Sequence, residues 1–272
     1  MYHEFYGLSE IPFSLTPNLK YIFKTESYLE VMANLRYGIA QSKGLVAVTG
    51  EVGLGKTTAL RSAIRQFDNS ILPVYIFNPS LTVGEFFRHL VNGLGLEVPR
   101  TASKPEVLDA LGRLLSVRHR KGMRTVLIID EAHGLSPKVL EEIRLLSNFE
   151  TNSEKLLQII LCGQPELGTV LNCPELRQLK QRISLRCTMK PLTPYQVNKY
   201  IRFRLKTAGA ERVNLFDPEA VALIAQVSLG TPRIVNNVCD NALLYGYSAN
   251  REVISREVIE EVLDALELQT VH

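Results

Sequence analysis

The phosphate-binding pattern G-x-x-x-x-G-K-[ST] is met at every fixed position by residues 50–57, GEVGLGKT. Glycines let backbone N–H groups curl around phosphate oxygens, and a following helix adds the partial positive charge of its N-terminus. In this pattern Lys56 reaches the β- and γ-phosphates, and Thr57 offers its hydroxyl to Mg²⁺. The alternative is a glycine-rich turn that fits by chance. The expected nucleotide-binding residues here are Gly50, Glu51, Val52, Gly53, Leu54, Gly55, Lys56, Thr57 and Thr58.

The segments around this loop have the patterns that the chemistry needs. Residues 45–49 read as a short buried strand, and residues 58–64 read as a helix. A second apolar, β-branched run covers residues 125–129 and is typical of a parallel strand buried on both faces. Since ligands bind at the carboxyl ends of such strands, the acids that follow this run are expected to face the phosphates.

These two acids have different expected roles. Asp130 is expected to hold Mg²⁺ through water, and Glu131 to orient and polarise the attacking water. An ordinary acidic cap at a strand end is the alternative for either residue. Together with the glycine-rich loop they predict an enzyme that hydrolyses a nucleoside triphosphate, with Mg²⁺ as the cofactor.

Composition limits the other classes of function. The chain has 272 residues, 46% of them hydrophobic, and 31 basic against 28 acidic residues give a net charge of +3. This balance does not by itself argue for nucleic acid or an anionic membrane as a partner. The four cysteines show no paired or metal-type spacing, which indicates free thiols in a reducing compartment. Neither a signal peptide nor an apolar run of about 20 residues is visible, so we expect a cytoplasmic protein.

Strand and helix patterns alternate through the middle of the chain. Strands are expected at residues 45–49, 72–77, 125–129, 157–162 and 183–189, with helices between them. Ser103 and Glu106 form a capping box, and Ser136-Pro137 begins another helix. Such alternation predicts an α/β domain with a parallel five-stranded sheet covered by helices on both faces.

The two ends of the chain have different patterns. The first 42 residues are rich in aromatics and are expected to form a loop-rich lead-in and a helix from about Ser27 to Gln41. After Pro191 only helices are expected, and they open at Thr193, Asp217, Thr231 and Ser255. The expected organisation is a lead-in at 1–42, a nucleotide-binding domain at 43–190 and a small helical lid at 191–268.

An α/β nucleotide domain followed by a helical lid resembles the plan of the AAA+ ATPases, from about residue 10 to residue 266. Particular strings resemble the ExeA/GspA-type secretion ATPases more closely. The most specific are Gly163-Gln164-Pro165-Glu166-Leu167 and Gln181-Arg182-Ile183. Others are Phe5-Tyr6-Gly7-Leu8, Pro12-Phe13, Asp130-Glu131-Ala132-His133, residues 145–150 (LLSNFE) and Gly230-Thr231-Pro232-Arg233.

This resemblance implies roles for further residues. Gln164 would be a polar sensor of the γ-phosphate, since an amide both donates and accepts hydrogen bonds. Arg182 would be an arginine finger that completes a neighbouring subunit's site, with Arg177 and Arg186 as competitors. Arg233, in the first turn of a lid helix, would be a second sensor. Asn78 would hold Glu131, unless it only forms a turn before Pro79.

The resemblance also implies a function and partners. It predicts a nucleotide-dependent homo-oligomer in the form of a ring that uses ATP to assemble or remodel a protein complex in a secretion or envelope/exopolysaccharide-export system. Such a chain would be cytoplasmic or reach the inner membrane through a partner. Full-length secretion relatives carry a transmembrane helix and a peptidoglycan-binding domain, so this chain is either an ATPase-only fragment or a stand-alone relative.

Three other functions are weighed against this one. An ATP-gated DNA-binding regulator, such as a transposition helper ATPase, would use two sets of basic residues. A non-hydrolysing nucleotide switch is disfavoured by the joint presence of Glu131, Arg182 and Arg233. The D-E-A-H string ending at His133 is not expected to mark a helicase, which needs two RecA-like domains; His133 is read as the first residue of a turn. The two basic sets are Arg113, Arg118, Arg120, Lys121 and Arg124, and Lys199, Arg202, Arg204 and Lys206.

Overall fold

A computed structural model describes residues 2–77, 80–99 and 101–268 of the chain. It divides into two compact units. The first, here called the sheet unit, comprises Glu26–Glu51 and Ala59–Met189. The second, here called the helical unit, has its described residues within Met1–Thr25, Val52–Thr58 and Lys190–His272.

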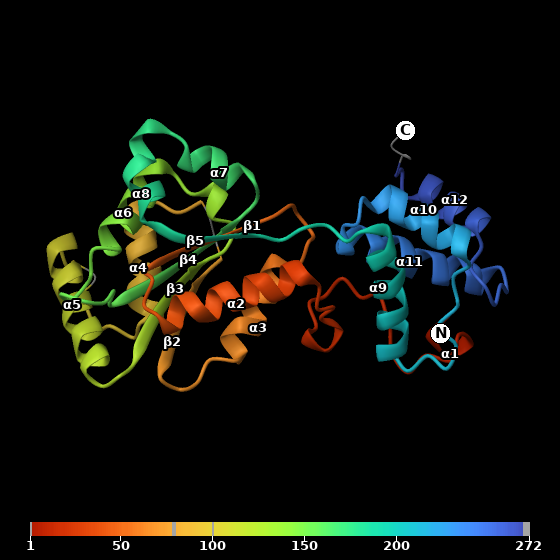
Figure 1. Cartoon of the computed structure of the whole chain (residues 1–272), viewed down its shortest axis with the longest axis horizontal. Helices are drawn as coiled ribbons and strands as arrows, with labels where there is room; N and C mark the ends of the chain where they lie inside the picture. Colours follow the sequence, from red (N-terminus) through yellow and green to blue (C-terminus); the bar gives the residue numbers. More distant parts are fainter. Residues whose placement is uncertain (1, 78–79, 100, 269–272) are drawn as a thin grey trace. The chain divides into compact units, whose positions relative to one another are not determined.

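The sheet unit contains one parallel sheet of five strands (Figure 1). Its strands lie side by side in the order β2-β3-β4-β1-β5. All five predicted strands are confirmed, with small differences at their ends. They are β1 (Leu45–Thr49), β2 (Ile71–Ile76), β3 (Arg124–Ile129), β4 (Leu157–Gly163) and β5 (Ile183–Thr188).

Helices cover both faces of this sheet, as the sequence predicts. On one face α2 (Glu26–Ala40) packs against β1 and β5, and a side chain at Gly38 would touch Val46 and Leu185. On the other face Leu127 and Ile159 share a core with α4 (Val83–Gly93), α5 (Lys104–Arg120) and α6 (Pro137–Leu146). The central strands are buried from both sides, which explains why most of their residues are apolar.

Capping interactions fix where these helices begin. The Glu106 carboxylate accepts hydrogen bonds from the Ser103 N–H at 2.6 Å and from the Ser103 hydroxyl at 2.7 Å, which is the expected pair at the start of α5. Thr82 and Glu85 do the same for α4. Short elements join the longer ones: η2 (Ala132–Gly134), α7 (Glu166–Leu171), η3 (Pro174–Leu176) and α8 (Arg177–Arg182).

The helical unit is built on four longer helices that share one apolar core (Figure 1). They are α9 (Pro194–Thr207), α10 (Pro218–Ser228), α11 (Pro232–Ser248) and α12 (Arg256–Ala265). The chain's beginning joins them, since α1 (Tyr2–Phe5), Phe13 and η1 (Leu19–Tyr21) contribute side chains to the same core. Within the described residues, no helix has the length and apolar character needed to span a bilayer.

A buried arginine, Arg204 of α9, fixes the beginning of the chain in this core. Arg204 is only 5% exposed. Its guanidinium donates to the Pro12 carbonyl at 2.5 Å, to the Tyr200 hydroxyl at 2.8 Å and to the Ser14 carbonyl at 3.4 Å. The ring of Tyr21 lies 4.6 Å from it. A planar cation with several donors suits this position because it bonds carbonyls while stacking on aromatic rings.

Replacing Arg204 with methionine is expected to lower the free energy of unfolding by about 2–4 kcal/mol. Methionine fills a similar space but leaves the Pro12 and Ser14 carbonyls without their buried donors. Arg202→Met, on an exposed position of the same helix, is the matched control and should stay within about 0.5 kcal/mol of wild type. Urea unfolding followed by circular dichroism measures both, and equal effects of the two substitutions would contradict this assignment.

Candidate functional site

Three strands of the sheet bring polar residues to one edge. In the parallel register Thr49 of β1 pairs with Gly163 of β4, and Ile129 of β3 pairs with Leu161 of β4. The chain leaves β1 into Gly50 and the glycine-rich loop, β3 into Asp130 and Glu131, and β4 into Gln164. All three exits therefore lie at the carboxyl edge of the sheet, where ligands of open α/β sheets bind.

The glycine-rich loop ends where α3 (Lys56–Arg65) begins. The first-turn N–H groups of α3 have no partner within their own helix and are suited to bind an anion, as at other helix N-termini. Gly53 and Gly55 have φ angles of +81° and +94°, which side chains rarely tolerate. Lys56 is only 5% exposed, so its ammonium is held within the protein rather than in bulk water.

The start of α11 contacts this loop within the helical unit. The Arg233 N–H donates to the Gly53 carbonyl at 3.3 Å. A side chain at Gly53 would come within 2.8 Å of the Arg233 Cβ and 2.9 Å of the Thr231 Cγ2. Gly53 is therefore required both by its backbone angle and by the close approach of Arg233, whose own side chain is exposed.

Asp130 lies at the end of β3 with its carboxylate buried, at 3% residue exposure. One carboxylate oxygen accepts from the Tyr75 hydroxyl at 2.8 Å, and the other accepts from the Glu131 N–H at 3.0 Å. Burial and then the charge of Asp130 raise the pKa of Tyr75 well above its usual range, so Tyr75 remains a donor. Sequence reasoning missed Tyr75. The feature that could have indicated it is a tyrosine one position before the end of β2, the strand that pairs with β3.

The Tyr75 hydroxyl and the Glu131 N–H orient the Asp130 carboxylate, and a single oriented carboxylate fits Mg²⁺. Mg²⁺ is usually bound by one or two carboxylates together with substrate phosphates and water, rather than by an all-protein cage. Among the described residues no group of three or more histidine, cysteine or acidic side chains forms such a cage. In the sheet unit, Asp130 is the oriented carboxylate that could bind such a metal.

Glu131 follows in an unusual backbone conformation. Its φ and ψ are 54° and 34°, the left-handed region that residues other than glycine seldom adopt. Its side chain is 42% exposed, and one carboxylate oxygen lies 3.6 Å from the Nδ1 atom of His133. Glu131 thus combines a strained backbone with a carboxylate open to water, a combination typical of functional positions.

Gln164 and His133 meet at the same edge. The backbone N–H of Gln164 points at the His133 Nδ1 atom at 3.3 Å, and its side-chain nitrogen lies 3.0 Å from the His133 Nε2 atom. The sequence predicted only a turn at His133, and the structure places it in η2. His133 is therefore a further polar residue of this site, and its contact with Gln164 spans 31 positions of sequence.

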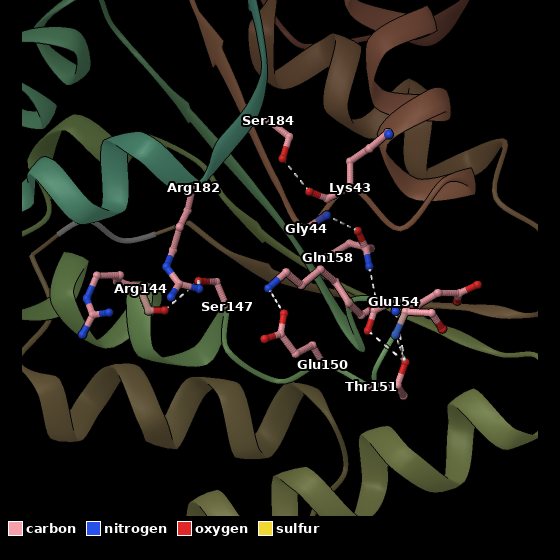
Figure 2. A network of polar contacts seen from close by, with 12 residues as sticks. Lys43, Gly44, Arg144, Ser147, Glu150, Thr151, Glu154, Gln158, Arg182 and Ser184 are labelled. Carbon is pink, nitrogen blue, oxygen red and sulfur yellow. Dashed lines mark hydrogen bonds and ion pairs between the residues drawn. The ribbon is translucent and has the colours of Figure 1, made fainter.

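Arg182 lies at the opposite edge of the sheet. It ends α8 just before β5, whose first residue, Ile183, pairs with Leu45 at the beginning of β1. Figure 2 shows its guanidinium directed at Ser147, to whose hydroxyl it donates at 3.2 Å; that hydroxyl donates to the Arg144 carbonyl at 2.6 Å. The structure therefore brings Asp130, Glu131 and Gln164 to one edge and leaves Arg182 at the other.

The two competitors of Arg182 have different surroundings. Arg177 begins α8 and is exposed. Arg186 lies on the edge strand β5 and donates to the Lys180 carbonyl at 3.0 Å. Asn78, which was expected to hold Glu131, lies outside the described residues.

Several members of the two basic sets have structural contacts. Arg118 donates to the Thr125 hydroxyl at 3.1 Å and to the Arg124 carbonyl at 3.0 Å, and desolvation lowers its pKa. Arg204 is the buried arginine that fixes the beginning of the chain. The two sets therefore do not form two continuous surfaces of free cations.

Comparisons with known proteins agree with this architecture. A family profile described as AAA domain matches residues 39–171. General secretion pathway protein A of Aeromonas hydrophila is 42% identical over 248 residues, which are 91% of this chain and 45% of that protein. The ATP-dependent target DNA activator B of Escherichia phage Mu is 30% identical over 123 residues, 45% of this chain and 37% of that protein. Each match thus covers less than half the length of the relative.

A solved structure has the same fold over most of the chain. The crystal structure of Cdc6p from Pyrobaculum aerophilum superposes with a TM-score of 0.71, covering 93% of this chain and 70% of that one at 16% identity. That similarity concerns the fold alone. The AAA domain match and the 42% identity to general secretion pathway protein A over 91% of this chain identify it as a member of the AAA+ ATPases, in the group that resembles that protein.

Proposed function

We propose that this chain binds ATP at the carboxyl edge of its sheet and hydrolyses it to ADP and phosphate. The observation that carries the proposal is the arrangement of the three strand ends. The glycine-rich loop, the buried Asp130 and the partly exposed Glu131 all follow strands that end at one edge. Loop N–H groups, the first turn of α3 and Lys56 would bind the phosphates.

Each acidic residue then has a separate task. Asp130, held by Tyr75 and its own neighbouring N–H, would fix Mg²⁺ with the Thr57 hydroxyl. When bound, Mg²⁺ would neutralise charge on the β- and γ-phosphate oxygens. Glu131 would orient the attacking water and polarise its O–H bond. Gln164 would contact the γ-phosphate or this water from β4, and Arg233 would act from the start of α11 as a second sensor.

The position of Arg182 supports a role in trans. It precedes β5 at the amino edge, while the phosphate-binding residues follow strands at the carboxyl edge. An arginine there cannot serve the site at the other edge of its own sheet, but a neighbouring subunit can receive it. Because such a contact joins two different surfaces, it repeats around a closed rotation, and we infer a homo-oligomeric ring.

The cellular role proposed here is assembly or remodelling of a protein complex in a secretion or envelope-export system. The 42% identity to general secretion pathway protein A supports it. We place the activity in the cytoplasm, where ATP is available and cysteines stay reduced, with contact to the inner membrane through a partner. The proposed domains are the lead-in at 1–42, the nucleotide-binding domain at 43–190 and the lid at 191–268.

Lys56→Ala tests nucleotide binding directly. Its affinity for Mg-ATP is expected to fall at least about 30-fold, because a charge-assisted hydrogen bond to phosphate contributes about 2 kcal/mol or more. Lys138→Ala, an exposed lysine of α6, is the control and should bind as wild type does. Isothermal titration calorimetry measures both. Unimpaired binding by Lys56→Ala, or no binding by wild type, would overturn the proposed site.

A DNA-binding regulator is the second candidate, favoured by the similarity to the phage activator named above. Against it, Arg118 and Arg204 bond to the protein itself. Filter binding of duplex DNA, with and without ATP, separates the two functions. We expect no gain in DNA affinity on adding ATP. Tight, ATP-dependent binding that weakens steeply with salt would reverse the ranking.

A further inference from the structure

A neutral hydroxyl, rather than a carboxylate, holds the Arg182 side chain. Ser147 caps the end of α6 and is only 3% exposed. Its hydroxyl gives its one proton to the Arg144 carbonyl at 2.6 Å, so the oxygen faces the Arg182 guanidinium as an acceptor, at 3.2 Å (Figure 2). Within the described residues the Arg182 guanidinium forms no ion pair. This cation is therefore oriented without direct contact to a negative charge.

Two carboxylates lie close enough to interact with the charge of Arg182, yet each is bound to another cation. Both Glu141 oxygens accept from the Arg144 Nε atom at 2.9 Å. The Glu150 carboxylate forms an ion pair with the Lys155 ammonium. The bond to Arg144 lowers the pKa of Glu141, the bond to Lys155 lowers the pKa of Glu150, and the charge of Arg182 contributes to both shifts. Both acids are thus ionised and already paired.

This arrangement preserves the charge of Arg182 for another anion. A carboxylate would bind the guanidinium through a fork of two charged hydrogen bonds and would neutralise it. The Ser147 hydroxyl accepts a single hydrogen bond and carries no charge, so most of the five guanidinium N–H groups stay available. The end of α6 adds only the partial negative charge of a helix C-terminus, which favours a cation there without pairing with it.

We propose that Ser147 is a positioning residue for Arg182, and that Lys155 keeps the nearby Glu150 carboxylate from pairing with it. The anion for which Arg182 is kept is the phosphoryl group of a nucleotide bound to a second copy of this chain. This inference rests on the proposed function, which places Arg182 in trans, and adds the residues that hold the arginine ready for its neighbour. Ser147 and Lys155 act through Arg182 and are not catalytic residues themselves.

Lys155→Met tests the role of the ion pair. Methionine keeps the apolar stem, which lies close to Gly44, but removes the ammonium and leaves Glu150 free to bind Arg182. The kcat for ATP is expected to fall about five-fold, the upper range for one partly exposed ion pair, with ATP affinity unchanged. Adding Glu150→Gln to Lys155→Met removes the competing charge and should restore the rate. An unchanged rate in Lys155→Met, or no recovery in the double variant, would overturn the role of Lys155.

Ser147→Ala tests the role of the hydroxyl. Without its acceptor the guanidinium is no longer oriented, and we expect kcat to fall about ten-fold at unchanged ATP affinity, because small misplacements of a catalytic group are costly. Ser184→Ala is the matched control. Ser184 lies two positions after Arg182, and its hydroxyl donates to the Lys43 carbonyl at 2.7 Å, so its loss should leave the rate unchanged. Equal rates for the two variants would contradict a positioning role for Ser147.

Mixed oligomers show which subunit carries the defect of Ser147→Ala. Mixed with Glu131→Gln, which keeps Arg182 held by Ser147, the Ser147→Ala subunits should gain activity several-fold. Mixed with Arg182→Ala they should gain none, because neither chain then offers a well-oriented arginine. A gain with Arg182→Ala would place the defect in the subunit's own nucleotide site and overturn the proposal.

Wild-type and Arg182→Ala chains distinguish this inference from the proposed function. A wild-type chain that does not hydrolyse ATP, or an Arg182→Ala chain with the wild-type rate, would overturn the proposed function and this inference with it. If both behave as proposed while Ser147→Ala and Lys155→Met keep the wild-type rate, only the present inference is overturned.

Discussion

Glu131→Gln is expected to give a chain that binds Mg-ATP but turns it over at least about 100-fold more slowly than wild type. Glutamine keeps the size of the side chain but is a far weaker base, so water near it is not polarised. Asp130 has its own donors in Tyr75 and a backbone N–H, and its carboxylate should stay in place. The loss should therefore appear in kcat and not in nucleotide affinity.

Phosphate release under saturating ATP measures this effect, and calorimetry gives the affinity. Glu166→Gln is a matched control, because Glu166 begins α7 close in sequence to Gln164 and is exposed, yet has no proposed role. It should retain the wild-type rate. Near-normal turnover by Glu131→Gln would remove Glu131 from the mechanism, even if the nucleotide binds as proposed.

The sequence predicts the sheet well because each strand has its own local pattern of apolar residues. The strands at 125–129 and 157–162 consist mainly of apolar residues, and such runs form where a strand is buried on both faces. The capping box at Ser103 and Glu106 is equally local, and it begins α5 as expected. Once the sheet is taken as parallel, the direction of β3 alone places Asp130 and Glu131 at its carboxyl edge.

Contacts between distant positions were less accessible to sequence reasoning. Tyr75 reaches Asp130 across 55 positions, and Gln164 reaches His133 across 31. Nothing in the local pattern of either pair predicts the contact, because the register of neighbouring strands decides it. The burial of Arg204 was also not apparent from the sequence. Arg204 lies among other basic residues on a helix and reads as exposed, yet it is buried and donates to the Pro12 carbonyl near the beginning of the chain.

Arg182→Ala is expected to lower ATP turnover by about 1,000-fold or more while ATP affinity stays near that of wild type. An arginine that contacts the transferred phosphoryl group of a neighbour stabilises charge that develops only in the transition state. Arg177→Ala and Arg186→Ala are matched controls from the same segment, and both should keep most of the activity. Phosphate release and calorimetry give rate and affinity, and a chain that no longer binds ATP would contradict a role in trans.

Mixing two inactive variants separates a role in trans from local damage. In a mixed oligomer, an Arg182→Ala subunit offers an intact Glu131, and a Glu131→Gln neighbour offers an intact Arg182. Sites formed between these two in the right order are complete, so the mixture should regain activity that neither variant has alone. If Arg182 instead acted within its own subunit, each site in the mixture would still lack one group and no activity would return. The position of Arg182 at the amino edge, before β5, is what makes recovery the expected result.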